Sequence, residues 1–225
     1  MRFSMFPATR LSSRLSLLLL LALLLVVSVA DAIQLDDQLM NWVLIQHGPA
    51  AQQRLKDWQR LNNLIEKAPV DRQLELVNRF FNRAEFVDDI DHWGKEDYWA
   101  TPVELLATNG GDCEDFAIAK YLTLKAAGVP DEQLRVVYVK SLVLDQAHMI
   151  LAWYQTPDAE PLILDNLINE IKPASQRTDL EPVYSFNGEG LWRNKSARER
   201  ARIGTANELE RWRDLNQRLI EPLQQ

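Results

Sequence analysis

The sequence predicts an α+β domain in which helices come first and an antiparallel sheet follows. Before residue 128, apolar residues recur at steps of three and four, the period of an amphipathic helix. From residue 134 the period changes to two, which is typical of strands, and short polar turns separate these strands. A run of helices followed by a run of strands indicates an α+β arrangement.

Residues 1–32 have the pattern of a signal peptide. Three arginines precede a leucine-rich run, residues 15–29, and an Ala-Asp-Ala cleavage motif follows it. The apolar run is shorter than the roughly twenty residues that a membrane-spanning helix needs, although a retained anchor stays the alternative. We therefore expect export to the periplasm, no membrane insertion after cleavage, and one domain over residues 33–225.

Bulk properties limit the classes of partner and of cysteine chemistry. The chain has 32 acidic against 25 basic side chains, which argues against nucleic acid or an anionic membrane as partner. The single cysteine, Cys113, cannot form an internal disulfide. In an oxidising compartment it is either buried and inert or reactive.

Two helical runs come first. One carries apolar residues from Leu55 to Ile65 and the other from Leu74 to Phe81. An acidic loop with Asp88, Asp89 and Asp91 follows, and we interpret it as a solvated turn, with a second metal site as the alternative. Residues 101–104 then form a capping box with proline at the first helical position, and this short helix should end at residues 109–111.

The next helix should begin beside the cysteine. Asp112 is a suitable N-cap with Asp115 three residues later, and the apolar pattern continues to residue 127. Strands are expected at residues 134–139, 148–154 and 162–165, and a hairpin at 183–192. A final helix should begin near the capping pair Thr205 and Glu208.

Cys113 lies in the first turn of its predicted helix. The N–H groups and dipole of a helix N-terminus stabilise a thiolate, the form in which cysteine is a nucleophile. Free cysteines are also among the most buried residue types, so the placement alone leaves both interpretations open.

A thiolate needs a base and a group that orients the base. His148 begins one predicted strand and Asp165 ends the next. If these strands pair antiparallel, the two side chains meet. A hydrogen-bonded strand-end histidine and a turn-forming aspartate are the alternatives for each residue taken alone.

Six segments of the chain carry a resemblance to a known family: YWATP (98–102), GGDCEDFAIAKY (110–121), GVP (128–130), VVYVK (136–140), HMILA (148–152) and LILDNL (162–167). In these segments the chain resembles the bacterial transglutaminase-like cysteine proteinases, and within them the LapG-type periplasmic proteases. The resemblance implies a papain-like or transglutaminase-like fold and a catalytic triad of Cys113, His148 and Asp165.

Three carboxylates flank the cysteine: Asp112, Glu114 and Asp115. Their charge opposes a thiolate, and a bound calcium ion would offset it, because hard cations bind carboxylate oxygens. Helix capping by Asp112 and Asp115 is the alternative. The resemblance implies calcium as cofactor, with these three residues as ligands.

The resemblance also implies a substrate and a partner. The substrate would be the N-terminal region of a large cell-surface adhesin, whose cleavage releases biofilm. The partner would be an inner-membrane cyclic di-GMP receptor that sequesters the protease. Two other functions stay open: a transglutaminase or acyltransferase on the same fold, and a non-catalytic calcium-binding module.

Overall fold

The computed structural model describes residues 35–194 and 200–220. The predicted signal peptide lies outside these residues. Within the described ranges, no helix combines the length and apolar character that crossing a bilayer requires.

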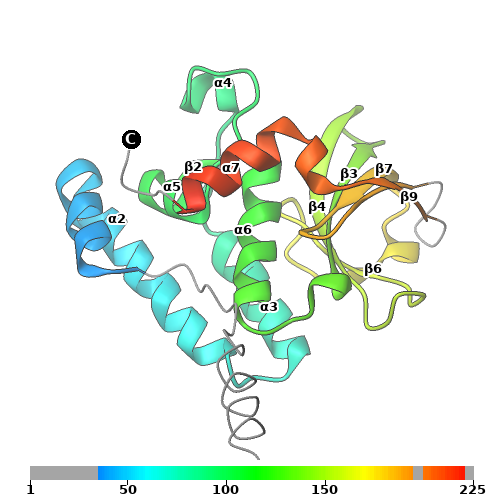
Figure 1. Ribbon diagram of the computed structural model, residues 1–225, viewed down its shortest axis with the longest axis horizontal. Coiled ribbons are helices and arrows are strands. Elements are labelled where there is room, and N and C mark those ends of the chain that lie inside the picture. Colours follow the sequence, from blue (N-terminus) through cyan, green and yellow to red (C-terminus); the bar gives the residue numbers. More distant parts are fainter. Residues whose placement is uncertain (1–34, 195–199, 221–225) are drawn as a thin grey trace, which may run out of the picture. The chain divides into compact units, whose positions relative to one another are not determined.

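Helices and strands follow the predicted order (Figure 1). The α-helices are α2 (Asp37–Ile65), α3 (Val70–Phe81), α4 (Asp89–His92), α5 (Pro102–Thr108), α6 (Cys113–Ala126) and α7 (Glu210–Ile220). The strands are β1 (Glu85–Phe86), β2 (Gly110–Gly111), β3 (Leu134–Ser141), β4 (Gln146–Trp153), β5 (Leu162–Leu164), β6 (Lys172–Pro173), β7 (Leu180–Phe186), β8 (Leu191–Asn194) and β9 (Arg200–Gly204). Short 3-10 turns are η1 (Asp131–Gln133), η2 (Ala174–Gln176) and η3 (Ala206–Glu208).

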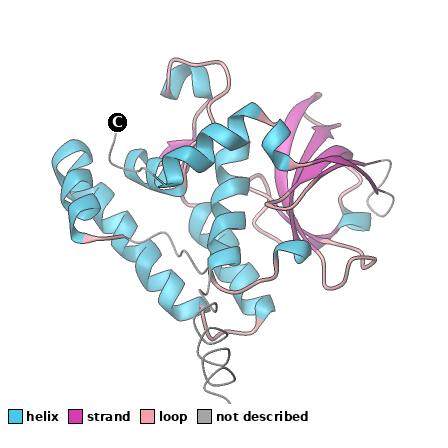
Figure 2. Ribbon diagram, in the orientation of Figure 1, coloured by secondary structure: helices cyan, strands magenta, loops and turns pink. Residues whose placement is uncertain are grey.

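The helices gather on one side of a seven-stranded antiparallel sheet (Figure 2). The strand order is β6-β5-β4-β3-β7-β8-β9, and every neighbouring pair is antiparallel. Helix α6 packs against β4 and β3 on one side and against α3 and α5 on the other. The predicted α+β class is confirmed.

Helix α6 is buried on nearly all sides, which is expected of a helix whose apolar residues encircle it. Phe116, Ile118 and Tyr121 are each at most 2% exposed. Lys120 is also fully buried, and its Nζ atom has no hydrogen-bond partner within the described part of the chain. Burial lowers the pKa of Lys120 to about 7, although the nearby Asp165 carboxylate acts in the opposite direction.

The central strands are covered on both faces. Val136, Met149 and Leu151 face the main core with α6, whereas the opposite face forms a second cluster. That cluster consists of Val137, Val139, Ile150, Ala152, Tyr154 and Ile163, and Ala174 and Leu180 pack against it. Burial on both faces explains why β3 and β4 are apolar at most positions, not only at alternate ones.

Some local features differ from the sequence-based expectations. Helix α2 contains a kink, because Gly48 has a left-handed φ of 83° and Pro49 follows it. The capping box of Thr205 and Glu208 starts the 3-10 turn η3, and α7 begins only at Glu210. Strand β9 was not predicted, although its sequence, RARIG, alternates charged and apolar residues over four positions.

Candidate active site

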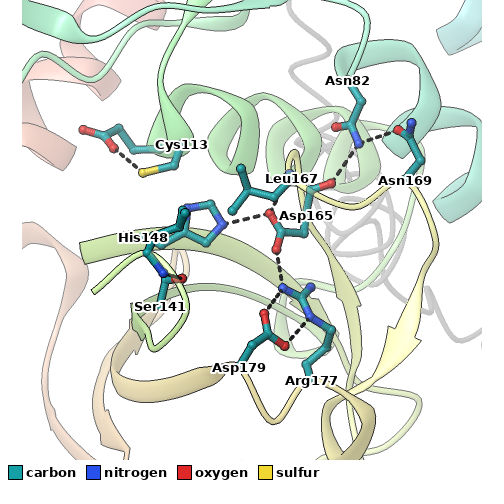
Figure 3. A network of polar contacts seen from close by, with 11 residues as sticks. Asn82, Cys113, Ser141, His148, Asp165, Leu167, Asn169, Arg177 and Asp179 are labelled. Carbon is teal, nitrogen blue, oxygen red and sulfur yellow. Dashed lines mark hydrogen bonds and ion pairs between the residues drawn. The ribbon is translucent and has the colours of Figure 1, made fainter. Parts of the chain in front are cut away.

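Cys113 is the first residue of α6. Its thiol is partly buried and donates a hydrogen bond to Glu114 Oε2 over 3.1 Å. The backbone N–H of Met149, the residue after His148, hydrogen-bonds the sulfur. The thiol therefore lies near the backbone of β4 at the residue after His148, and Figure 3 draws Cys113 and His148 in one close view.

His148 and Asp165 are joined across two paired strands. Strand β4 pairs antiparallel with β5, with Leu151 opposite Leu164. The start of β4 therefore lies next to the end of β5. His148 Nε2 is 2.8 Å from Asp165 Oδ1, and both residues are at most 3% exposed. The predicted antiparallel pairing and the contact between the two side chains are confirmed.

Three further groups hold Asp165 in place. Its Oδ1 accepts the Leu167 backbone N–H over 3.0 Å, and its Oδ2 accepts Arg177 Nη2 over 2.8 Å. Asn82 of α3 donates to the Asp165 carbonyl over 2.8 Å. Burial acts to raise the pKa of Asp165, but the hydrogen bonds from His148, Leu167 and Arg177 outweigh it and lower the pKa to about 2. The carboxylate is therefore ionised and fixed.

Sequence reasoning missed Asn82 and Arg177. Arg177 is 3% exposed and also bonds Asp179 over 2.8 Å, so its guanidinium joins two carboxylates (Figure 3). Neither residue has a local motif, and each reaches Asp165 only through tertiary packing. The sequence shows only that an arginine follows the candidate triad aspartate by twelve residues, and its burial cannot be read from that spacing.

The pKa of the Cys113 thiol is raised well above its usual range. Burial is the main cause, and the carboxylates of Glu114 and Asp112 add to it. The thiol therefore stays protonated unless the neighbouring negative charge is offset. A helix N-terminus favours a thiolate, but here burial and the adjacent acids together raise the pKa of the thiol.

The acids form one cluster at the start of α6. Carboxylate oxygens of Asp89, Asp112 and Asp115 lie within 4.8 Å of one another, and so do those of Asp89, Asp97 and Glu114. Burial, followed by the charges of neighbouring acids, raises the pKa of Asp112 to about 10. Burial likewise raises the pKa of Asp89 to about 6. When ionised together these acids repel one another, and a bound cation would offset that repulsion.

Two oxygens in this cluster are free to bind a cation. Asp89 Oδ1 and Asp112 Oδ1 are buried and have no hydrogen-bond partner among the described residues. Buried carboxylate oxygens without partners, held close together, form a donor set that suits a hard divalent cation. The interpretation of the acidic loop as a solvated turn is wrong for Asp89, which is only 3% exposed.

Asp115 differs from the other predicted ligands. Its Oδ1 accepts the Ala100 N–H over 2.6 Å, and its Oδ2 accepts the Asp112 N–H over 3.1 Å. Asp115 thus ties the start of α6 to the preceding loop, as the predicted capping role requires. Asp112 has one oxygen, Oδ1, without a hydrogen-bond partner among the described residues, and Glu114 accepts only the Cys113 thiol in the hydrogen bonds described above. The structure adds Asp89 to the candidate ligands.

Gly111→Ala is expected to disturb this cluster. A Cβ at position 111 would lie 2.9 Å from Asp115 Cβ and would clash with Asp115 Oδ2. Displacing the Asp115 carboxylate weakens its two backbone hydrogen bonds, so we expect the free energy of unfolding to fall by about 1–3 kcal/mol. Urea unfolding measures this value. An unchanged stability would contradict the close approach of Asp115 to residue 111.

Comparison with known proteins identifies the family. The family model of the bacterial transglutaminase-like cysteine proteinases matches residues 51–186, which contain all three predicted triad residues. The chain belongs to this family. It is therefore a cysteine peptidase, and the transglutaminase-like fold predicted from the sequence is confirmed.

Solved structures give the same result. Legionella pneumophila LapG is 45% identical over 81% of this chain and 94% of its own, with a TM-score of 0.71. A calcium-bound structure of that LapG has a TM-score of 0.70 and covers 81% and 98% of the two chains, also at 45% identity. An EGTA-treated structure has a TM-score of 0.72 at the same identity and covers 81% of this chain and 96% of its own. A search of curated protein sequences gave no significant match. This bacterial transglutaminase-like cysteine proteinase is thus of the LapG type.

Proposed function

We propose that this cysteine peptidase is a periplasmic, calcium-dependent endopeptidase that cuts the N-terminal region of a large cell-surface adhesin and thereby releases biofilm. The observation that supports the catalytic part most strongly is the buried hydrogen bond between His148 and Asp165 beside the thiol of Cys113. It occurs in a chain that is 45% identical to Legionella pneumophila LapG.

Each triad residue has a defined role in the proposed reaction. Asp165 is bonded to Nε2 of His148, so Nδ1 is the ring nitrogen available to Cys113. His148 takes the thiol proton through Nδ1, and the resulting thiolate attacks the scissile carbonyl. The imidazolium then protonates the leaving amine. Water, deprotonated by the same ring, hydrolyses the thioester and restores the thiol.

The backbone also takes part in this reaction. The N–H of Cys113, at the start of α6, is a natural donor to the oxyanion that forms during acyl transfer. Asp165 remains ionised throughout and stabilises the imidazolium, as the low pKa of its carboxyl group requires.

We infer that calcium is the cation that the acidic cluster binds. Asp112 and Glu114, with Asp89 and the more constrained Asp115, would hold it through carboxylate oxygens. A bound calcium ion would supply the positive charge that offsets the carboxylates beside the thiol. Two observations support this choice: the free oxygens of Asp89 and Asp112, and the existence of calcium-bound and EGTA-treated structures of the similar LapG.

The cellular part of the proposal depends on the family resemblance and on the leader-like residues 1–32. We propose that the enzyme acts in the periplasm and that an inner-membrane cyclic di-GMP receptor sequesters it. To test the function, purified protein is mixed with cell-surface fractions, with and without calcium. A defined adhesin fragment should appear only with calcium, and only when residue 113 is cysteine. If no fragment depends on residue 113, the proposed protease function fails.

Asp165→Asn is expected to lower kcat by about three to four orders of magnitude, because the orienting charge is lost. The variant also tests the low pKa of Asp165. A carboxyl whose pKa falls from 3.8 unfolded to about 2 folded stabilises the protein above pH 3.8, by about 2 kcal/mol. This stabilisation is lost as the pH falls through about 2.

The stability difference between wild type and Asp165→Asn should therefore be largest near pH 7 and should shrink between pH 4 and pH 2. Urea unfolding at several pH values measures it. Asp145→Asn is the matched control, because the Asp145 side chain is 83% exposed and should give a small difference at every pH. An Asp165→Asn difference that does not vary with pH would contradict the ionised, hydrogen-bonded state.

A further inference from the structure

The turn between β3 and β4 exposes three consecutive apolar side chains. Leu142 is 52% exposed, Val143 is 79% exposed and Leu144 is 48% exposed. We call these three residues the hairpin tip. Turns usually carry polar residues, and a cluster of exposed apolar side chains commonly marks a contact surface. The charges beside it, Lys140 and Asp145, pair with each other over 2.7 Å and leave the hairpin tip itself uncharged.

The hairpin tip is held in a defined conformation. The Leu142 N–H donates to the Asp179 carbonyl over 2.8 Å, and the Leu144 N–H donates to Ser141 Oγ over 3.3 Å. Ser141 is only 2% exposed, so the hydroxyl that fixes the turn is itself buried. A surface that is ordered before contact loses little entropy on binding, which favours a recognition role.

The hairpin tip continues directly from the active site. His148 lies on β4 only four residues after Leu144, and Figure 3 shows Ser141 beside it. On the edge away from β3, β4 pairs with β5 only through Leu151–Trp153. Among the described strands, none therefore pairs with that edge of residues 146–150; His148, Met149 and Ile150 are buried there, whereas Gln146 and Ala147 are exposed. An extended peptide can follow such an edge from the thiol toward the hairpin tip.

We propose that the hairpin tip is a docking surface for the protein substrate, and that it binds apolar residues about four positions from the scissile bond in an extended segment. This inference rests on the proposed function. A strand rises about 3.3 Å per residue, so β4 spans about 7 Å from His148 to its first residue, Gln146, and the turn that carries the hairpin tip lies just beyond. An extended substrate covers this distance with three or four residues.

The size of the surface favours a peptide over a second copy of this chain. Three partly exposed side chains offer at most a few hundred Å², whereas stable protein interfaces bury about 1,200 Å² or more. One or two apolar side chains of a peptide are enough to cover the hairpin tip. The continuity with the active site assigns that peptide to the substrate.

The test uses a library of peptides from a digested proteome, incubated with the purified protein and calcium, with cut sites read by mass spectrometry. We expect apolar residues to be enriched three to five positions from the cut, on one side only. Val143→Glu should remove this enrichment and lower kcat/KM about tenfold for a peptide that is apolar there. The same peptide, truncated before that position, should be cut equally by wild type and variant. Ile45→Glu, on α2, is the matched control, because Ile45 is 77% exposed.

Each other outcome overturns the inference. Cys113-dependent cutting without the enrichment, or with the enrichment retained in Val143→Glu, removes the docking role and leaves the proposed function intact. Equal slowing of long and truncated peptides would show that the hairpin tip acts on catalytic geometry. A change in oligomeric state in Val143→Glu, measured by size-exclusion chromatography, would assign the surface to a second copy. If no peptide is cut in a Cys113-dependent way, the proposed function fails as well.

Discussion

Replacing Cys113 by alanine is expected to abolish peptide cleavage, with a loss of about four orders of magnitude or more in kcat. The sulfur is the nucleophile that we assign to the His148 and Asp165 pair, and it lies near the backbone of the residue after His148. The fold should survive, because the change removes one partly buried atom and keeps the backbone of α6. Cleavage of an identified substrate, followed by gel electrophoresis and mass spectrometry, measures the loss.

Two controls separate catalysis from folding. Circular dichroism and calcium titration should give the same results for Cys113→Ala as for wild type. The base has a matched pair of variants: His148→Ala should be as inactive as Cys113→Ala, whereas His47→Ala changes an exposed histidine on α2 and should keep full activity. Proteolysis that persists in Cys113→Ala would remove the nucleophile assignment.

Removing calcium with EGTA is expected to inactivate the wild type reversibly, by about two orders of magnitude or more. A unit negative charge about 4 Å from the sulfur disfavours the thiolate by about 4 kcal/mol at an effective dielectric constant of 20, so even one uncompensated carboxylate produces such a loss. Activity should return when calcium is added in excess. The measurement is the initial cleavage rate against free calcium concentration.

The calcium experiment includes a test variant, Glu114→Gln, and a control variant, Asp91→Asn. Glu114 contacts the thiol and lies in the acidic cluster, so Glu114→Gln should raise the calcium concentration needed for half-maximal activity by tenfold or more. Asp91 is exposed in α4, and Asp91→Asn should leave that concentration unchanged. Full activity of the wild type in excess chelator would refute the calcium proposal.

Local sequence signals predicted the framework of the site well. The capping pairs at residues 101–104 and 112–115 correctly predicted where α5 and α6 begin, and α6 begins at Cys113. The alternating strands and their short turn correctly predicted that His148 and Asp165 would meet. Both signals depend on residues close in the chain, where the geometry of capping and pairing is known in advance.

The site residues that the sequence did not predict are positioned by tertiary packing. Asn82 and Arg177 reach Asp165 from α3 and from the segment after η2, and no residue pattern near either of them indicates this. Asp89 was expected in a solvated loop, because it stands in the sequence with the acidic residues Asp88 and Asp91, and these two are exposed in the structure. Its burial results from the way α4 folds over β2 and the start of α6, which a single sequence does not reveal.

Asp165 is bonded to residues of α3, of β4 and of the segment after η2. The catalytic residues are therefore aligned only when folding is complete. The β3–β4 hairpin forms from neighbouring residues, but the contact from Asn82 requires closure of a much longer loop, because Asn82 precedes Asp165 by 83 residues. A chain with a frayed β5 edge would keep its sulfur and its imidazole but lose the group that aligns them. An incompletely folded molecule should therefore cleave peptides much more slowly than the folded enzyme.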